Sequence, residues 1–149
     1  MKLYFIVLIG LLLTSFVQAQ TTPNPQLGYT YKVETGVAGK QVYISGQRPF
    51  NANGELVGAG NLSAQTRQVF ENIAAALDRV GMNMGNVKQV TYLLKGVSGL
   101  VNVSDSQQAS SVGTSFFGQA APSIQDVKSI EKIARDDVLV EVEVVAVKE

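Results

Sequence analysis

The sequence predicts a single α+β domain in which two helices pack on one face of a mixed β-sheet. Two observations predict this class. Runs rich in β-branched and aromatic residues alternate with helical patterns in the order strands, helix, strand, helix, strands. The chain of 149 residues is also long enough to bury one hydrophobic core, so no second domain is needed.

The N-terminal residues are typical of a secretory signal. Lys2 precedes an almost unbroken apolar run at 3–13, and small residues at 17–19 suit a cleavage site. The run is shorter than the roughly 20 apolar residues that a membrane-spanning helix needs. We therefore expect residues 1–19 to be a cleaved signal peptide, and the mature protein to be periplasmic or secreted without stable membrane association. An uncleaved N-terminal anchor is the alternative.

A hairpin is expected where the folded domain begins. Residues 20–28 contain two prolines and suggest an irregular leader, which places the domain at 29–149. Tyrosine and valine alternate with polar residues over 29–35, and a β-branched and aromatic run follows at 42–44. Two glycines lie between these runs. The second strand is expected to stop at Ser45, where small and polar residues mark a first candidate site.

The clearest helical pattern lies between Asn61 and Gly81. Asn61 or Ser63 can cap its start, and Gly81 suits a left-handed C-terminal turn. Apolar residues recur on one face, which indicates that the helix lies on the protein with one face in solvent. The solvent side is expected to hold Arg67, Glu71, Asn72 and Asp78.

Three more elements are expected before the last strand. Residues 86–95 predict a strand that is buried from both sides. A helix is expected within 101–119, where only a few apolar residues share one face, and a strand within 124–133.

The last strand, at 138–147, has two different faces. Val140 and the alternate residues after it point one way, while Glu141 and Glu143 share the opposite face with other apolar residues. If both helices cover one side of the sheet, the other side still carries apolar side chains, among them Tyr43, Leu93 and Val145. We therefore expect self-association, with the site at the seams between subunits.

Composition excludes several classes of function. The full chain has 12 basic and 12 acidic residues, and loss of the signal would leave 130 residues with a net charge of −1. No long-range field therefore draws the protein to nucleic acid or anionic lipid. The absence of histidine and cysteine excludes serine and cysteine triads, thiol redox chemistry, disulfides and the usual zinc sites.

Carboxylates, tyrosines and lysines remain for proton transfer. Glu141 and Glu143 stand out because they interrupt an otherwise apolar strand. They could act as general acid or base in a subunit cleft. Alternatively, they form a solvent-facing pair on an edge strand that discourages aggregation. Asp126, Asp136 and Asp137 lack calcium-loop spacing and are interpreted as turn residues, so no metal is expected.

Four segments together resemble the RidA/YjgF family. They are Val-Tyr-Ile-Ser-Gly-Gln at 42–47, a Gln-x-x-x-x-x-x-Asn-Ile motif at 65–73, the strand at 87–94 and Val-Glu-Val-Glu at 140–143. The resemblance implies a chorismate-mutase-like α+β fold and a homotrimer with clefts between subunits. It also implies hydrolysis of reactive imines and enamines to a keto acid and ammonia, with neither metal nor organic cofactor.

The resemblance also implies roles for individual residues. Glu141 matches the glutamate that handles the water or proton, and Ser45 and Gly46 line the cleft. The cleft tyrosine is matched by Tyr29 or Tyr31, and the family's asparagine by Asn102; Gln125 is a further substrate-binding candidate.

One departure from the family limits the substrates that we expect. Active deaminases carry an arginine shortly after a proline, where residues 122–127 here contain none. That arginine grips the substrate carboxylate, and two lost charge-assisted bonds would cost about 3 to 6 kcal/mol. Arg48 and Arg135 are possible substitutes, but simple alternation sends Arg48 to the face opposite Ser45 and Gln47.

Three functional classes remain open on the sequence. The first is a hydrolase acting on a neutral or cationic imine through Glu141, with weak or absent activity on iminoacids. The second is a non-catalytic trimer that binds a small metabolite in its clefts or a partner on its surface. The third, a ribonuclease, agrees least with the neutral charge and the absence of histidine.

Overall fold

The computed structural model describes residues 30–36 and 39–149, with side chains from Gln41 onward. The predicted signal peptide, the leader and Tyr29 lie outside this part of the chain. The elements follow the predicted order: β1 (Thr30–Gly36), β2 (Gly39–Gln47), α1 (Leu62–Asp78), the 3-10 helix η1 (Met84–Asn86), β3 (Val87–Lys95), α2 (Val103–Phe117), β4 (Ile124–Ile130) and β5 (Val140–Lys148).

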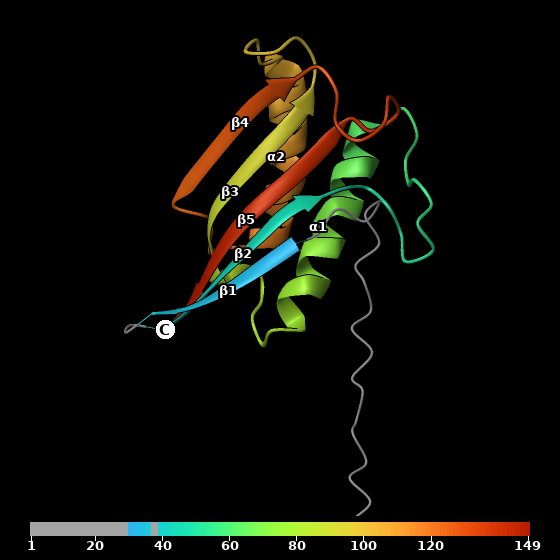
Figure 1. Cartoon of the computed structure of the whole chain (residues 1–149). Coiled ribbons are helices and arrows are strands. Elements are labelled where there is room, and N and C mark those ends of the chain that lie inside the picture. The colour runs from blue at the N-terminus through green and yellow to red at the C-terminus, as the bar shows by residue number, and fades with distance from the viewer. Residues whose placement is uncertain (1–29, 37–38) are drawn as a thin grey trace, which may run out of the picture.

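The five strands form one mixed sheet in the order β1-β2-β5-β3-β4. The β3–β4 pair is parallel and the other pairs are antiparallel, which confirms the predicted mixed sheet. β5 lies in the centre of the sheet (Figure 1). The alternative that Glu141 and Glu143 belong to an edge strand is therefore wrong, because β2 and β3 pair with β5 on its two sides.

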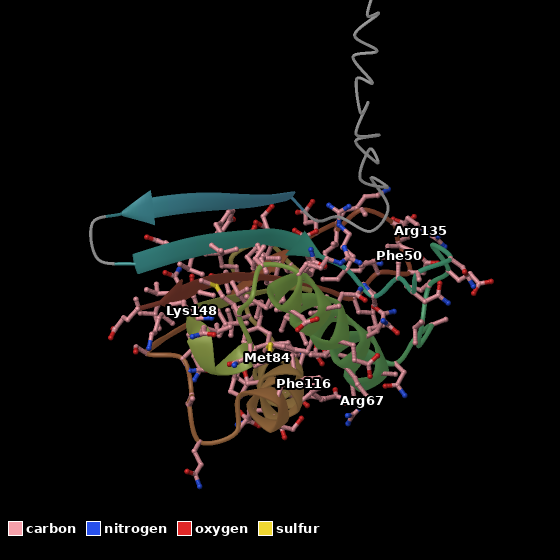
Figure 2. All side chains as sticks on the ribbon, turned by 90° about the horizontal axis from the view of Figure 1, so that it is seen from below. Phe50, Arg67, Met84, Phe116, Arg135 and Lys148 are labelled. Atoms are coloured by element: carbon pink, nitrogen blue, oxygen red, sulfur yellow. The ribbon has the colours of Figure 1, made fainter. Side chains whose placement is uncertain are left out.

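Both helices lie on the same face of the sheet, as the sequence predicts (Figures 1 and 2). α1 packs on β2 and β5, and α2 packs on β3 and against α1. Asn61 caps α1, since its Oδ1 accepts a hydrogen bond from the backbone N–H of Ala64 at 3.0 Å. Gly81, just beyond the end of α1, has a φ of +71°, which matches the predicted left-handed turn.

An aromatic cluster joins the two helices to the sheet. Phe70 on α1 is fully buried, and its ring contacts those of Tyr92, Phe116 and Phe117, with centroids 5.3 to 5.9 Å apart. Gly113 allows α2 to approach this closely, because a Cβ at this position would collide with Tyr92 Oη and lie 2.9 Å from Phe70. The helix-covered face is thus a continuous apolar core.

The opposite face of the sheet, which we call the open face, has no helix over it. Along β5, burial alternates between fully buried valines toward the helices and half-buried residues on the open face. Tyr43 on β2 is 39% exposed. Apolar side chains therefore remain on a surface that no other described element of this chain covers.

A smaller apolar cluster closes one end of the sheet. It contains the buried residues Phe50, Ile133 and Val138, with Arg135 over the ring of Phe50 at 5.6 Å (Figure 2). This cluster packs together the segments that leave β2 and enter β5. Within residues 30–36 and 39–149, no helix is both long and apolar enough to cross a membrane.

Candidate functional site

An ion pair on the open face joins the end of β2 to the start of β5. Arg48, which directly follows β2, donates a hydrogen bond from Nε to Glu141 Oε2 at 2.6 Å. The side chains are 24% and 12% exposed, so this ion pair is only partly open to solvent. Glu141, the predicted catalytic residue, is thereby held in one orientation.

A β-bulge brings Arg48 to this position. Ile44 pairs with Val144, but Gln47 pairs with Val142, so β2 has one residue more than β5 over this interval. Gly46, with a φ of +60°, lies within the bulge. The bulge places Gln47 toward α1 and turns Arg48 toward Glu141. Arg48 does lie on the face opposite Gln47, as simple alternation predicts, but the extra residue in β2 puts Gln47 rather than Arg48 on the helix side, so Arg48 reaches Glu141 on the open face.

The segment that carries Arg48 is tied to α1 through Asn72. Asn72 Nδ2 donates to the carbonyl oxygens of Arg48 and Phe50, both at 2.9 Å. Asn72 is half-buried beneath this segment, so its predicted place on the solvent side of the helix is wrong. An amide that spans two backbone carbonyls leaves no periodic signal in the sequence, which is why the helical pattern missed it.

Tyr43 and Glu143 lie next to this pair on the open face. Together with Gln89, Thr91 and Val145, they border a shallow hollow of about 30 Å³. Burial, followed by the charge of the Glu143 carboxylate and a hydrogen bond to it, raises the pKa of the Tyr43 hydroxyl above its ordinary value. Tyr43 is therefore a neutral hydrogen-bond donor at physiological pH.

β4 contributes no arginine to the open face. The register pairs Thr91 with Asp126 and Leu93 with Lys128, so Asp126 and Lys128 share the face of Glu141. Asp126 and Lys128 lie 3.5 Å apart and are largely exposed. This agrees with the absence of the carboxylate-binding arginine from the sequence, because β4 carries Asp126 and its partner Lys128 on this face.

Within one chain, the other predicted site residues do not all lie on the face of the sheet that carries Glu141. Ser45 is half-buried in the bulged part of β2 beside Gly46. Gln125 pairs with Val90, whose side chain faces the helices, so Gln125 lies on the opposite side of the sheet from Glu141. Tyr31 lies in β1 opposite Ile44, but its side chain is outside the described part of the structure.

Asn102 has a structural role in this chain. Its Oδ1 accepts a hydrogen bond from the backbone N–H of Asp105 at 3.1 Å and so caps α2. The signal for this cap was present in the sequence, since an asparagine precedes the helical pattern and an aspartate follows three residues later. Asn102 also borders a wide hollow of about 540 Å³ between the end of β3 and the start of α2.

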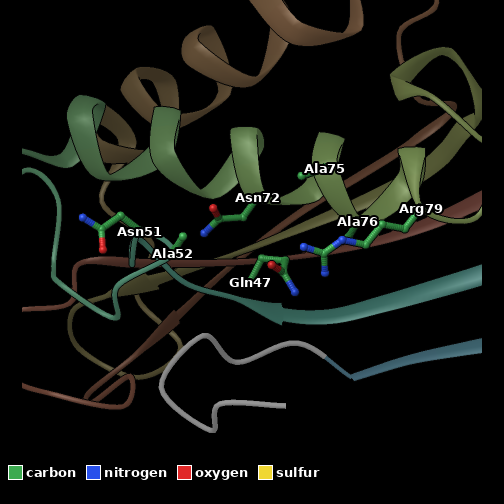
Figure 3. A pocket seen from close by; sticks show the side chains of 7 residues that line it. All are labelled: Gln47, Asn51, Ala52, Asn72, Ala75, Ala76 and Arg79. Atoms are coloured by element: carbon green, nitrogen blue, oxygen red, sulfur yellow. The ribbon is translucent and has the colours of Figure 1, made fainter. Parts of the chain in front are cut away.

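A separate cavity of about 170 Å³ lies on the helix side of the same strand end (Figure 3). Its polar lining includes Gln47, which is only 2% exposed, and Asn51 and Asn72, whose amides already bond to other groups of the chain. The cavity is lined by Gln47, Asn51, Ala52, Asn72, Ala75, Ala76 and Arg79. No cluster of three or more acidic side chains that could hold a metal occurs among the described residues.

The chain is similar to several known proteins. The family model described as endoribonuclease L-PSP matches residues 19–148. A RutC family protein of Pyrococcus horikoshii is 33% identical over 131 residues, which cover 87% of this chain and 94% of the relative. The 2-iminobutanoate/2-iminopropanoate deaminase of Salmonella typhimurium is 30% identical over 112 residues, which cover 74% of this chain and 81% of that enzyme.

Solved structures agree with these matches. A protein of the conserved Rid family from Yersinia pestis superposes with a TM-score of 0.65 at 27% identity, covering 87% of this chain and 94% of that protein. The sequence resemblance and the fold therefore point to the same group of proteins. This chain belongs to the endoribonuclease L-PSP family, the family also called RidA/YjgF.

Proposed function

We propose that this protein is an exported homotrimer whose subunit clefts hydrolyse neutral or cationic imines and enamines, with weak or absent activity on iminoacids. The observation that carries the proposal is the Arg48–Glu141 pair on the open face, beside a β4 strand without an arginine. The membership in a family with named imine deaminases supports the reaction type.

The apolar surface of the open face supports the trimer. Tyr43 is 39% exposed, and Leu93, Val145 and Val147 are half-buried on the same side of the sheet. Exposure of such an apolar surface to water is unfavourable, and contact with sister chains would remove it from solvent. A subunit placed here would also enclose Glu141 and Arg48 and so form a cleft around them.

The chemistry needs one carboxylate and one water. Glu141 would take a proton from water as the water oxygen bonds to the imine carbon. Glu141 would return this proton to the imine nitrogen, which gives a carbinolamine. It would then take the proton of the new hydroxyl group and pass it to the amino nitrogen as the C–N bond breaks, to give the carbonyl product and ammonia. Arg48 fixes the orientation of the carboxylate for these transfers, because its Nε holds Oε2 at 2.6 Å.

Acidic substrates are disfavoured by the charges around Glu141. A substrate carboxylate would meet Glu143 on the same face, the Asp126–Lys128 pair of β4 carries compensated charges, and the guanidinium of Arg48 is already compensated by Glu141. Two charge-assisted bonds to a carboxylate are worth about 3 to 6 kcal/mol. Their loss corresponds to a factor of roughly 100 to 10,000 in turnover.

Export is part of the proposal. The signal-like segment at 1–19 and the start of the family match at residue 19 support a leader that precedes the family domain. N-terminal sequencing of the protein recovered from outside the cytoplasm should begin at Gln20. Recovery of a chain that still begins at Met1 would contradict export by a cleaved signal.

The activity is tested with two freshly generated substrates. One is 2-iminopropanoate, and the other is the neutral imine formed by oxidation of benzylamine. We expect hydrolysis of the neutral imine and its loss in Glu141→Gln, with little acceleration for the iminoacid. Substantial iminoacid turnover that Arg48→Ala lowers much more than it lowers turnover of the neutral imine would overturn the proposal, because Arg48 would then serve as the carboxylate-binding arginine.

One observation favours a second candidate, a trimer that binds a small molecule without converting it. Glu141 Oε2 is engaged by Arg48 at 2.6 Å, and a carboxylate fixed in this way can serve for recognition alone. In this case amines and amides soaked into crystals would be found unchanged, and no imine hydrolysis would depend on Glu141.

A further inference from the structure

α1 carries two amides that reach the backbone of the segments flanking the site. Gln65 and Asn72 are seven residues apart, which is about two helical turns, so both project from the same side of α1. Gln65 is fully buried and Asn72 is half-buried. Each bonds to backbone groups outside the helix, but the two segments that they hold differ in what else fixes them.

Gln65 holds the segment that enters β5. Its Nε2 donates to the carbonyl of Asp137 and its Oε1 accepts from the N–H of Leu139, both at 2.8 Å. The pairing with β3 already fixes this part of the chain, because Leu94 pairs with Val140 and Leu93 with Glu141. The position of Glu141 is therefore set by the sheet even without Gln65.

Asn72 holds the segment that leaves β2. Its two donors bind the carbonyls of Arg48 and Phe50, and its Oδ1 accepts from Gln68 Nε2 at 3.0 Å, which fixes the amide orientation. Figure 3 shows Asn72 directed from α1 toward this segment. The last pair between β2 and β5 joins Gln47 and Val142, so Arg48 lies one residue beyond the ladder.

We infer that Asn72 is a positioning residue: it places Arg48 against Glu141 and so sets the orientation of the site carboxylate. Gln65 has the same chemistry on the same helix but does not have this role, since its segment is held by β3. The two amides thus form a natural pair of test and control. For its activity measurement alone, the inference rests on the proposed function.

The first experiment measures the coupling between Arg48 and Glu141. A double-mutant cycle with Arg48→Met and Glu141→Gln, read by urea unfolding at one protein concentration, should show a favourable coupling in the wild type. The cycle is then repeated in Asn72→Leu and in Gln65→Met. We expect the coupling to be lost in Asn72→Leu and kept in Gln65→Met, although both variants lose stability.

A second variant and a further control keep this test decisive. Asn72→Ser, which retains one donor, replaces Asn72→Leu if the latter does not fold, and the coupling should then be reduced rather than lost. Thr66→Val removes a buried hydrogen bond that stays within α1, from Thr66 Oγ1 to the carbonyl of Leu62. Full coupling in the Asn72 variants would overturn the inference, as would its loss in Thr66→Val.

The second experiment measures hydrolysis of the neutral imine. Asn72→Leu should lower kcat at least about tenfold with little change in KM, since displacing a catalytic group by about 1 Å can cost up to roughly 100-fold. Arg48→Met should produce the same loss, and the double variant should lose no more. If the wild type hydrolyses no imine, the proposed function fails, but the coupling experiment still decides the role of Asn72.

Discussion

The two faces of the sheet differ in what covers them and in what they carry. On the helix side, Val140, Val142, Val144 and Ala146 of β5 are at most 1% exposed. On the open face, the neighbouring Glu141, Glu143 and Val145 are half-buried. One strand therefore supplies both a sealed core and a partly solvated surface.

This difference explains why the candidate site, the Arg48–Glu141 pair, lies on the open face. Among the described residues, none that is fully buried carries a charge. A charged pair such as Arg48 and Glu141 needs water or further polar groups around it, because burial of ions is costly. The open face provides this environment and still keeps the pair at exposures of 24% and 12%.

The helix-covered face should be the more sensitive to lost volume. Phe70→Ala removes a fully buried ring that contacts three other aromatic rings. We expect the free energy of unfolding to fall by about 3 to 5 kcal/mol, because a cavity remains where the ring was. Urea unfolding followed by circular dichroism measures this loss.

The matched change on the open face is Val145→Ala. Val145 is half-buried and faces away from the helices, so its truncation should cost less than about 1 kcal/mol when the protein is dilute and monomeric. Equal losses for the two variants would show that the faces do not differ in the way that the structure indicates.

The open face should be the more sensitive to added charge at high protein concentration. Leu93→Asp places a carboxylate beside Glu141, in the region that we propose sister chains cover. An unpaired charge buried at an interface costs about 3 kcal/mol or more. We expect analytical ultracentrifugation to show a roughly threefold drop in mass relative to the proposed trimer.

Ser111→Asp is the control for this change. Ser111 is exposed on α2, on the helix side of the molecule. Its replacement by aspartate therefore adds the same charge away from the open face. The mass should then be unchanged. If Leu93→Asp keeps the wild-type mass, or if Ser111→Asp also lowers it, the open face is not the site of association.

The sequence predicted the covered face far better than the site. Caps and periodicity located α1 through Asn61 and Gly81, and the valine alternation of β5 separated the two faces correctly. These features are local or periodic, so the residues themselves carry the signal. The placement of both helices on one face followed from the order of the elements.

The contacts of the site depend on single departures from periodicity. One extra residue near Gly46 reverses the side on which Arg48 lies, and only a glycine within a strand pattern hints at this bulge. The face of Gln125 is fixed by its register with β3, which the sequence does not encode locally. The bonds of Asn72 to Arg48 and Phe50 join residues 24 and 22 positions apart, so no window of neighbouring residues predicts them.

Each face also carries a tyrosine, and the two should respond differently to loss of the hydroxyl. Tyr92 is fully buried in the core, and its Oη has no hydrogen-bond partner in the described part of the chain. Tyr92→Phe removes this unsatisfied group, so we expect the free energy of unfolding to rise by about 1 kcal/mol. Urea unfolding at neutral pH measures the change, and destabilisation would indicate that the hydroxyl has a partner after all.

The contribution of Tyr43, on the open face, to the stability of the protein should instead depend on pH. Burial first, and then the Glu143 carboxylate, raise the pKa of the Tyr43 hydroxyl, whereas in the unfolded chain it ionises near its ordinary value of about 10. Because the folded state holds the proton more tightly, this contribution to stability is complete below about pH 10 and is lost as the pH rises through the higher folded value. The urea midpoint should therefore fall between pH 9 and pH 11, and Tyr43→Phe should reduce this fall.

Burial also raises the pKa of Tyr92, so Tyr92→Phe at the same two pH values separates the core contribution from that of the open face. An identical fall in Tyr43→Phe and the wild type would mean that neither burial nor Glu143 raises the pKa of Tyr43 in the folded protein.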